Sequence, residues 1–364
     1  MKKILLGTAA LLGTAVMAQG AAAQVTVKFG GDIRFDAAWI DDDLSNAKDV
    51  NFVQEVRFPI SVEGKTDNGL TYGAFIRLRN SGSNHGASST PSATNGENFY
   101  AERKYVYVES AFGRVEMGDE WGAVTKLSGF APAVGIGQLD GDWGKWSDFG
   151  LFQYVPAAYF DRSTKVTYYT PRLVGVQAGV SYTPSVGQIG DNNSLARRLN
   201  TATAYQDRVE LAANYKGEFG GFTVDLGGGY AFADETSVAL DSYKSWNVSA
   251  AVGYAGFIVG GTYFDNNRTL ESLLDIADLE NKGWNAGVSY DAGPFALGVS
   301  YGRTNSESAD GTIGDDSMWA IGGTYSVAPG LALQADVYLL DSDNAFGGTG
   351  NDATVVMLRT NLLF

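Results

Sequence analysis

Hydrophobic and polar side chains alternate with a period of two along most of this chain. Between residues 174 and 183 the apolar side chains occupy every second position: Val174, Val176, Ala178, Val180 and Tyr182. A period of two places each set of side chains on one face of a β-strand. The same alternation recurs at 208–216, 222–230, 246–254, 284–291, 295–301 and 319–327. The pattern predicts an all-β protein with many strands.

One uncharged segment, Ser245–Phe264, is long enough to cross a bilayer as a helix. Its internal order does not support a helix, because Trp246, Val248 and Tyr254 lie on alternate positions. An Ala-Gly pair at 255–256 then interrupts the run. The segment is therefore predicted to form two strands joined by a tight turn.

Two kinds of β-protein fit this alternation. In a soluble sandwich the apolar faces pack on each other, whereas in a membrane barrel they meet lipid and the polar faces line the lumen. The connections alternate in length, because tight turns at 66–69 and 328–330 contrast with long polar loops at 81–98, 185–203 and 266–281. Short turns at one end and long loops at the other are typical of an outer-membrane barrel.

The side chains at the strand ends and on the polar faces also favour the barrel. Aromatic residues recur near strand ends, where the membrane interface attracts amphipathic rings: Trp39, Tyr182, Tyr230, Tyr254, Tyr290, Tyr301 and Trp319. The polar faces carry glycine, serine, threonine and charged residues, which are too small and too polar for the core of a sandwich. We therefore expect a transmembrane antiparallel β-barrel.

Sixteen strands can be counted, an even number that lets an antiparallel barrel close with both termini on one side. Their approximate ranges are 25–40, 50–63, 69–80, 99–110, 113–118, 161–171, 174–184, 205–216, 221–232, 243–254, 256–265, 282–291, 294–304, 316–327, 330–341 and 352–364. A barrel of this size is too wide for side chains to fill. Its lumen is predicted to hold water, as a channel or around a plug.

The segment 119–160 interrupts the alternation between the fifth and sixth strands. Long loops of this kind are usually functional. The segment carries aromatic residues that would be costly to expose together: Trp121, Trp143, Trp146, Phe149, Phe152, Tyr154 and Tyr159. It also carries Asp140, Asp142 and Asp148. The sequence therefore predicts that loop 119–160 folds into the lumen, with aromatic rings against the wall and an acidic edge toward the channel.

Two details of this loop can be predicted from spacing. Asp140 and Asp142 are separated by one glycine, so in an extended segment both carboxylates would point in the same direction. Trp143 and Trp146 follow directly and could anchor the segment against the wall.

The first 23 residues are predicted to be a cleaved signal peptide. Lys2 and Lys3 precede an apolar stretch, and Ala21–Ala23 supply the small residues of a cleavage site. The alternative, an N-terminal membrane anchor, fits less well because the apolar stretch is short and contains Gly7 and Gly13. Residues 24–364 would then form the barrel.

Composition excludes several functional classes. The chain has 26 Lys and Arg against 41 Asp and Glu, a formal net charge of −15, whereas a nucleic-acid-binding protein needs a basic surface. It has no Cys and one His, so thiolate zinc sites, cysteine nucleophiles and histidine-rich metal centres are excluded. Loss of Lys2 and Lys3 with the signal peptide would bring the net charge near −17. The absence of cysteine also fits passage through an oxidising periplasm.

Taken together, these features resemble a Gram-negative general-diffusion porin, a sixteen-stranded trimeric type that is typical of alphaproteobacteria. The resemblance covers the whole predicted mature chain and is strongest at Phe112-Gly113-Arg114, before the fifth strand, and in the last strand with its terminal Phe364. It implies a homotrimer of water-filled barrels. It also implies that the third external loop forms an acidic edge opposite basic residues on the wall, and that Phe364 acts as an assembly signal.

The alternation selects the inward-facing residues to which the basic role can be carried over. Apolar neighbours point outward, so five arginines on the first four strands point inward: Arg34, Arg57, Arg77, Arg79 and Arg103. The resemblance implies that they form the basic side of the constriction; the alternative is that they pair with lumen acids such as Glu55. Many family members carry an arginine just after the fifth strand, whereas this chain has Asp119-Glu120-Trp121. This departure weakens the basic side and leaves the ion selectivity open.

No catalytic constellation emerges from the sequence. His85 lies in a polar loop without a strand pattern that would orient it as a catalytic base. We therefore predict no enzymatic activity, and an outer-membrane hydrolase is the runner-up to the channel. A solute-specific, sugar-type channel or an adhesin is a further alternative, because aromatic side chains could line a path for sugars.

The expected function is passive diffusion of ions and small hydrophilic solutes across the outer membrane, with a modest cation preference. The expected partners are two further copies of the chain in a homotrimer, outer-membrane lipid, lipopolysaccharide and the assembly machinery, but no nucleic acid. No cofactor or structural metal is expected. Acidic runs at 41–43, 315–316 and 341–343 are weak candidates for surface-bound calcium.

Overall fold

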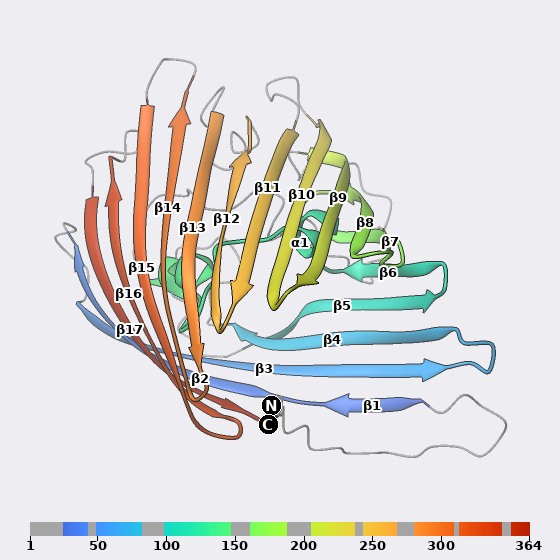
Figure 1. Ribbon diagram of the computed structural model, residues 1–364, viewed down its shortest axis with the longest axis horizontal. Coiled ribbons are helices and arrows are strands. Elements are labelled where there is room, and N and C mark those ends of the chain that lie inside the picture. Colours follow the sequence, from blue (N-terminus) through green and yellow to red (C-terminus); the bar gives the residue numbers. More distant parts are fainter. Residues whose placement is uncertain are drawn as a thin grey trace.

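A computed structural model describes residues 25–42, 49–81, 98–146, 161–187, 205–236, 243–267, 280–308, 313–343 and 351–364 of the chain. The predicted signal peptide lies outside these residues, and so do Asp148 and His85. The described residues form one all-β unit in which antiparallel strands surround a central space (Figure 1).

The strand bounds follow the predicted ranges closely. The strands are β1 (Thr26–Phe29), β2 (Asp32–Asp42), β3 (Val50–Lys65), β4 (Thr71–Ser81), β5 (Asn98–Ser110), β6 (Gly113–Asp119), β7 (Thr164–Tyr169), β8 (Val176–Ser185), β9 (Tyr205–Phe219), β10 (Phe222–Glu235), β11 (Tyr243–Tyr254), β12 (Phe257–Asp265), β13 (Glu280–Ala292), β14 (Phe295–Glu307), β15 (Ile313–Ala328), β16 (Leu331–Ser342) and β17 (Asn351–Leu363). The largest differences flank β7 and β8. The predicted strand 161–171 is shortened to Thr164–Tyr169, and Val174, predicted to lie in the next strand, lies in the turn before β8 with a φ of 49°.

The barrel closes by pairing the last strand with the first full one. Each strand from β2 to β16 pairs antiparallel with the next, and β17 pairs with β2. β1 and β2 both pair with β3 and are separated only by Gly30 and Gly31, so they occupy one position in the barrel wall. The seventeen labelled strands therefore form a closed sixteen-stranded barrel, as predicted.

The period-two alternation sorts side chains between the outer and inner faces. On β2, Phe35 and Trp39 are 49% and 44% exposed on the outside, while Asp36 and Ala38 are buried on the inside. β17 shows the same division, with Leu358 57% exposed and Arg359 buried. An apolar outer face and a polar inner face are the arrangement that a membrane barrel requires.

Loop 119–160 contributes the short helices of the described chain. They are α1 (Ala123–Leu127), η1 (Gln138–Asp140) and η2 (Asp142–Lys145). No helix in the described ranges is long and apolar enough to cross a membrane.

Two apolar clusters lie inside the barrel, where the loop packs against the wall. The first joins α1 to inward-facing residues of β7 and β9–β11. The second joins Ala131, Ile136, Leu139 and Trp146 to inward-facing residues of β2 and β15–β17. The inner face beneath the loop is thus apolar, and these contacts fix the position of the loop on the wall.

Candidate functional site

Five inward-facing arginines gather on one side of the barrel. They form what we call the basic wall: Arg34 on β2, Arg57 on β3, Arg77 and Arg79 on β4, and Arg103 on β5. Their side chains are between 13% and 19% exposed. All five were predicted from the alternation, and the structure brings them together on adjacent strands.

The strand register places like charges directly opposite one another. Arg57 pairs with Arg79 across β3 and β4, and Arg77 pairs with Arg103 across β4 and β5. Like charges at opposed positions destabilise a sheet unless other groups neutralise them. The wall therefore depends on carboxylates placed among the arginines.

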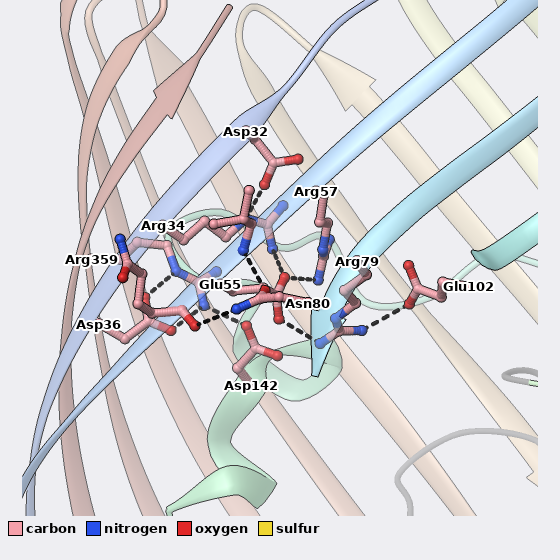
Figure 2. Close-up of polar contacts among 12 residues, drawn as sticks. Asp32, Arg34, Asp36, Glu55, Arg57, Arg79, Asn80, Glu102, Asp142 and Arg359 are labelled. Atoms are coloured by element: carbon pink, nitrogen blue, oxygen red, sulfur yellow. Dashed lines mark hydrogen bonds and ion pairs between the residues drawn. The ribbon is translucent and has the colours of Figure 1, made fainter. Parts of the chain in front are cut away.

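Glu55 on β3 is the first of these carboxylates. It is buried and contacts Arg34 at 3.5 Å, and it also forms ion pairs with Arg57 and Arg79 (Figure 2). Lys145 of η2 reaches the same carboxylate from the loop, with 3.2 Å between Nζ and Oε2. One glutamate thus joins four cations from three strands and the loop.

Glu102 on β5 is the second carboxylate. It lies 2.6 Å from Arg77 and 2.8 Å from Arg79, and it also pairs with Arg162. Its inward position results from a bulge, because Arg77 pairs with Arg103 while the next pair is Leu78 with Ala101. The extra residue in a β-bulge redirects a side chain. Simple alternation places Glu102 on the outer face, so its inward position cannot be predicted from the sequence pattern.

Arg103 is held by the residues that follow β6. Its guanidinium makes two hydrogen bonds to Glu120, at 2.7 and 2.8 Å. The same group lies over the ring of Trp121, 4.3 Å from the centroid, and 4.9 Å from that of Phe75. The Glu120-Trp121 departure from the family pattern therefore neutralises and orients one arginine of the basic wall.

Loop 119–160 leaves β6 and is first anchored through α1. The backbone N–H of Ala123 donates to Ser181 Oγ at 2.8 Å, and that of Val124 donates to Glu210 Oε2 at 3.1 Å. Both acceptors are buried, inward-facing side chains of β8 and β9. They satisfy two N–H groups at the start of a helix, which have no partner within the helix.

The loop then follows the inner wall across β11–β16 (Figure 1, green trace). Inward-facing polar side chains on successive strands bind its backbone. The N–H groups of Gly129, Ala131 and Gly135 donate to Ser249 (2.7 Å), Asn285 (2.9 Å) and Thr324 (3.0 Å), respectively. Buried backbone groups need such partners. The polar alternate positions of these strands thus hold the loop in place.

Asp336 on β16 fixes the middle of the loop. This fully buried carboxylate accepts the backbone N–H groups of Ile136 and Gln138, both at 2.9 Å, and the hydroxyl of Tyr338 at 2.8 Å. A Cβ atom on Gly135 would lie 1.9 Å from Asp336 Oδ1. Glycine at 135 is therefore required for this close approach.

The predicted geometry of Asp140 and Asp142 is wrong. Asp140 ends η1 and Asp142 begins η2, so the two residues are not part of one extended segment. The side chain of Asp142 faces Arg359 and Lys145, whereas Asp140 is exposed. Gly141 lies between them, where a Cβ atom would come within 2.7 Å of the hydroxyl of Tyr338.

The two aspartates also differ in electrostatic environment. Burial opposes ionisation of Asp142, but Lys145 and Arg359 outweigh it and hold the pKa of that carboxyl well below its usual range. Enclosure by the surrounding protein and the negative charge of Asp142 raise the pKa of Asp140 to about 7, although its side chain is exposed. Asp142 is therefore a structural anion, while Asp140 titrates near neutral pH.

A chain of ion pairs connects the acidic edge of the loop to the basic wall. Asp142 contacts Lys145 at 2.9 Å, Lys145 contacts Glu55 at 3.2 Å, and Glu55 contacts the arginines of β2–β4. Trp146 is buried against the wall, as its position after the aspartates suggested, and Trp143 packs beside it. The described part of the loop therefore ends next to the basic wall.

Several residues of this network were absent from the sequence predictions. Arg359 and Asp36 could have been found, because the same alternation that points Leu358 and Phe35 outward points them inward. Lys145 could have been found only from the fold, since its partner Glu55 lies 90 residues away.

Phe364 completes the seam between the two ends of the chain. Its backbone N–H donates to Gly31 O at 3.0 Å, and Gly31 N–H donates to Phe364 O at 2.8 Å. Its ring lies 6.4 Å from that of Phe58. The predicted role as an assembly signal stays a prediction.

Within the described ranges, no group of three or more His, Cys, Asp or Glu side chains is arranged to hold a metal ion. The polar groups of the basic wall are paired acids and bases around a water-accessible space. Such an arrangement can orient and sort charged and polar solutes without a covalent step.

Comparisons with known proteins agree with this geometry. The Gram-negative porin family matches residues 7–345. The porin of Rhodobacter capsulatus is 24% identical, and the match covers 88% of this chain and 96% of that protein. A porin structure refined at 1.8 Å has a TM-score of 0.63 at 21% identity, covering 93% of this chain and all of that one. OmpT of Vibrio cholerae in its trimer form has a TM-score of 0.58 at 15% identity, covering 93% and 99%.

Proposed function

The chain belongs to the Gram-negative porin family and forms an outer-membrane channel, and from this premise we propose that ions and small hydrophilic solutes cross it by passive diffusion. The observation that carries the proposal is the wide barrel whose inner face presents paired charged groups at partial exposure. A barrel of sixteen strands leaves an aqueous channel. The family and the fold are those of a non-enzymatic channel.

We further propose that loop 119–160 and the basic wall form the constriction. The contacts of Lys145 with Glu55 and of Glu120 with Arg103 support this, because they place both ends of the described loop beside the basic wall. Charged groups at a narrow point bias the passage of ions.

The proposal includes a modest preference for cations. The net charge of −15 supports it, and so does the pairing of each basic-wall arginine with a carboxylate. Asp140 adds an exposed carboxyl at the end of η1. The full loop edge also includes Asp148, which lies outside the described residues.

We also propose a homotrimer embedded in outer-membrane lipid and lipopolysaccharide after insertion by the assembly machinery. The exposed apolar outer face and the trimer form of the OmpT structure support it.

Conductance of the purified protein in planar bilayers tests the proposed function. We expect stepwise channels whose conductance rises linearly with salt and is not saturated by added sugar. A reversal potential measured in a salt gradient should indicate modest cation preference. Saturation by one sugar would instead indicate a solute-specific channel. The aromatic pair of Phe75 and Tyr105, whose ring centroids are 5.6 Å apart, is where a sugar would stack in that case. The absence of channels together with hydrolysis of lipid or peptide would contradict the proposal.

A further inference from the structure

Arg359 lies at the seam where the barrel closes. It is on β17, directly opposite Asp36 on β2, and both side chains are buried on the inner face. Its Nε and one terminal nitrogen bind the two oxygens of Asp36 at 2.6 and 2.7 Å (Figure 2). A bidentate arginine–carboxylate pair is strong and directional. The pair with Asp36 therefore orients the guanidinium independently of the loop.

The same guanidinium reaches the loop. The terminal nitrogen that binds Asp36 also donates to Asp142 at the start of η2. Asp142 in turn holds Lys145, which extends to Glu55 on β3. Arg359 thus joins the closing seam, the last described turn of the loop and the basic wall in one chain of contacts.

The other anchors of the loop act earlier in the sequence. Hydrogen bonds from β11, β13, β15 and β16 hold residues 129–138. By contrast, the polar contacts of η2 with the wall run through Asp142 and Lys145. The position of η2 therefore depends on Arg359 more than the position of η1 does.

We infer that Arg359 is a positioning residue of the channel, which fixes η2, and with it Asp142 and Lys145, beside the basic wall at the constriction. The inference rests on the proposed function, because it assigns the residue a role in selecting solutes at that same constriction. Asp142 then acts as the partner of Arg359, and Asp140 in η1 remains the exposed carboxyl of the described acidic edge. Without Arg359, η2 would move relative to the basic wall.

Three single variants separate the role of Arg359 in the loop from its role in the seam. Arg359→Gln removes both contacts. Asp142→Asn weakens the contact with Arg359, together with the Asp142–Lys145 ion pair, and leaves the seam intact, whereas Asp36→Asn weakens only the seam contact. Single-channel recordings should show a several-fold rise in the variance of the open-channel current for Arg359→Gln and Asp142→Asn. Asp36→Asn keeps Arg359 and its contact with Asp142, so its variance should stay closer to that of the wild type than the variance of either loop variant. Heating of the native protein in detergent should show that Asp36→Asn lowers the temperature at which the barrel unfolds.

Reversal potentials distinguish positioning from loss of charge. Loss of a cation should shift Arg359→Gln toward cations, and loss of an anion should shift Asp142→Asn away from them, although both raise the current variance. The double variant should show a variance no larger than either single variant, because the two residues act through one contact. Additive variances would overturn the inference.

The inference can be tested even if one of the variants does not fold. If Arg359→Gln does not assemble, Asp142→Asn still tests the inference, because it leaves the seam intact. Wild-type variance in an assembled Asp142→Asn channel would overturn it. The failure of the proposed function is separate, since the wild-type protein would then form no channels at all.

Discussion

At the scale of single residues, charge partners decide what an acidic side chain does in this channel. Asp140 and Asp142 are two positions apart, yet Asp142 is bound by Arg359 and Lys145 while Asp140 is exposed. An ion-paired carboxylate contributes little net charge to a passing ion. We therefore propose that Asp140 contributes to selectivity at the described acidic edge, whereas Asp142 anchors the loop.

The replacement Asp140→Asn should lower the cation preference and leave the conductance nearly unchanged, because the side chain keeps its volume and loses its charge. The pKa of Asp140 is raised to about 7, so its carboxyl is neutral well below that pH and charged well above it. The cation preference of the wild-type channel should therefore fall as the pH drops from about 8 to about 6, a window in which ordinary carboxyls do not titrate. Reversal potentials at low salt measure both effects.

Variants of the basic wall are the matched control for this prediction. Replacing Arg57, Arg77 and Arg103 by Ala should shift selectivity in the opposite direction and increase the conductance, because charge and bulk are both lost. Both effects should shrink near 1 M salt, where the screening length is only about 3 Å. If Asp140→Asn keeps the pH dependence of the wild-type channel, another group is responsible for it. If neither set of variants moves the reversal potential at low salt, the constriction lies elsewhere.

At the scale of elements, the two faces of a strand have different functions, because alternate side chains point to the membrane and to the lumen. The outer face of β17 presents Leu358 and Leu362 to the membrane, while its inner face presents Arg359 to the loop. The end of the same strand closes the barrel against Gly31. A change in one face of a strand can therefore leave the function of the other face intact.

Deletion of Phe364 should reduce insertion into the outer membrane sharply, because it removes the end of the closing strand. The structure adds a subtler variant: a Cβ atom on Gly31 would lie 2.4 Å from the ring of Phe364, so Gly31→Ala should displace that ring and reduce assembly. Gly30→Ala is the control, since its Cβ would lie 3.4 Å from the nearest atom. The yield of folded protein in isolated outer membranes measures the effect. Equal yields for Gly31→Ala and Gly30→Ala would show that assembly does not require the packing of the Phe364 ring against Gly31.

At the scale of the whole molecule, the barrel reverses the usual distribution of polar and apolar side chains. Large apolar residues such as Phe52 and Leu297, 60% and 61% exposed, lie on the outside, and buried ion pairs lie on the inside. Closure leaves no free edge from β2 to β17, because each of these described strands is paired on both sides. These are properties of a protein that is stable in lipid rather than in water.

Closure and trimer formation predict a species that resists detergent at room temperature. On a gel, the unheated protein should migrate as a compact oligomer, and boiling should convert it to a single chain of different mobility. Circular dichroism of the unheated sample should show β-structure. A compact single chain without an oligomer would contradict the trimer but not the barrel, whereas unchanged mobility with a helical spectrum would contradict both.

The sequence alone determined the barrel and the inward direction of the basic wall. Alternation is a local property, because successive side chains of a strand must point to opposite faces whatever the strand's neighbours are. It therefore placed Arg34, Arg57 and Arg103 on the inner face without any knowledge of their contacts. The same reasoning identified the segment after β6 as the one that does not belong to the wall.

Only the tertiary structure decided which charges meet. Glu102 turns inward because of a bulge, which changes the local register and is invisible to a period-two pattern. Arg359 and Asp142 are 217 residues apart, and they meet because the barrel closes and the loop follows its inner wall. The partners of a charged group depend on contacts between distant segments, whereas the face it occupies depends only on its strand. The physical reason is that side-chain direction is set by local backbone geometry, and ion pairing is set by the closed fold.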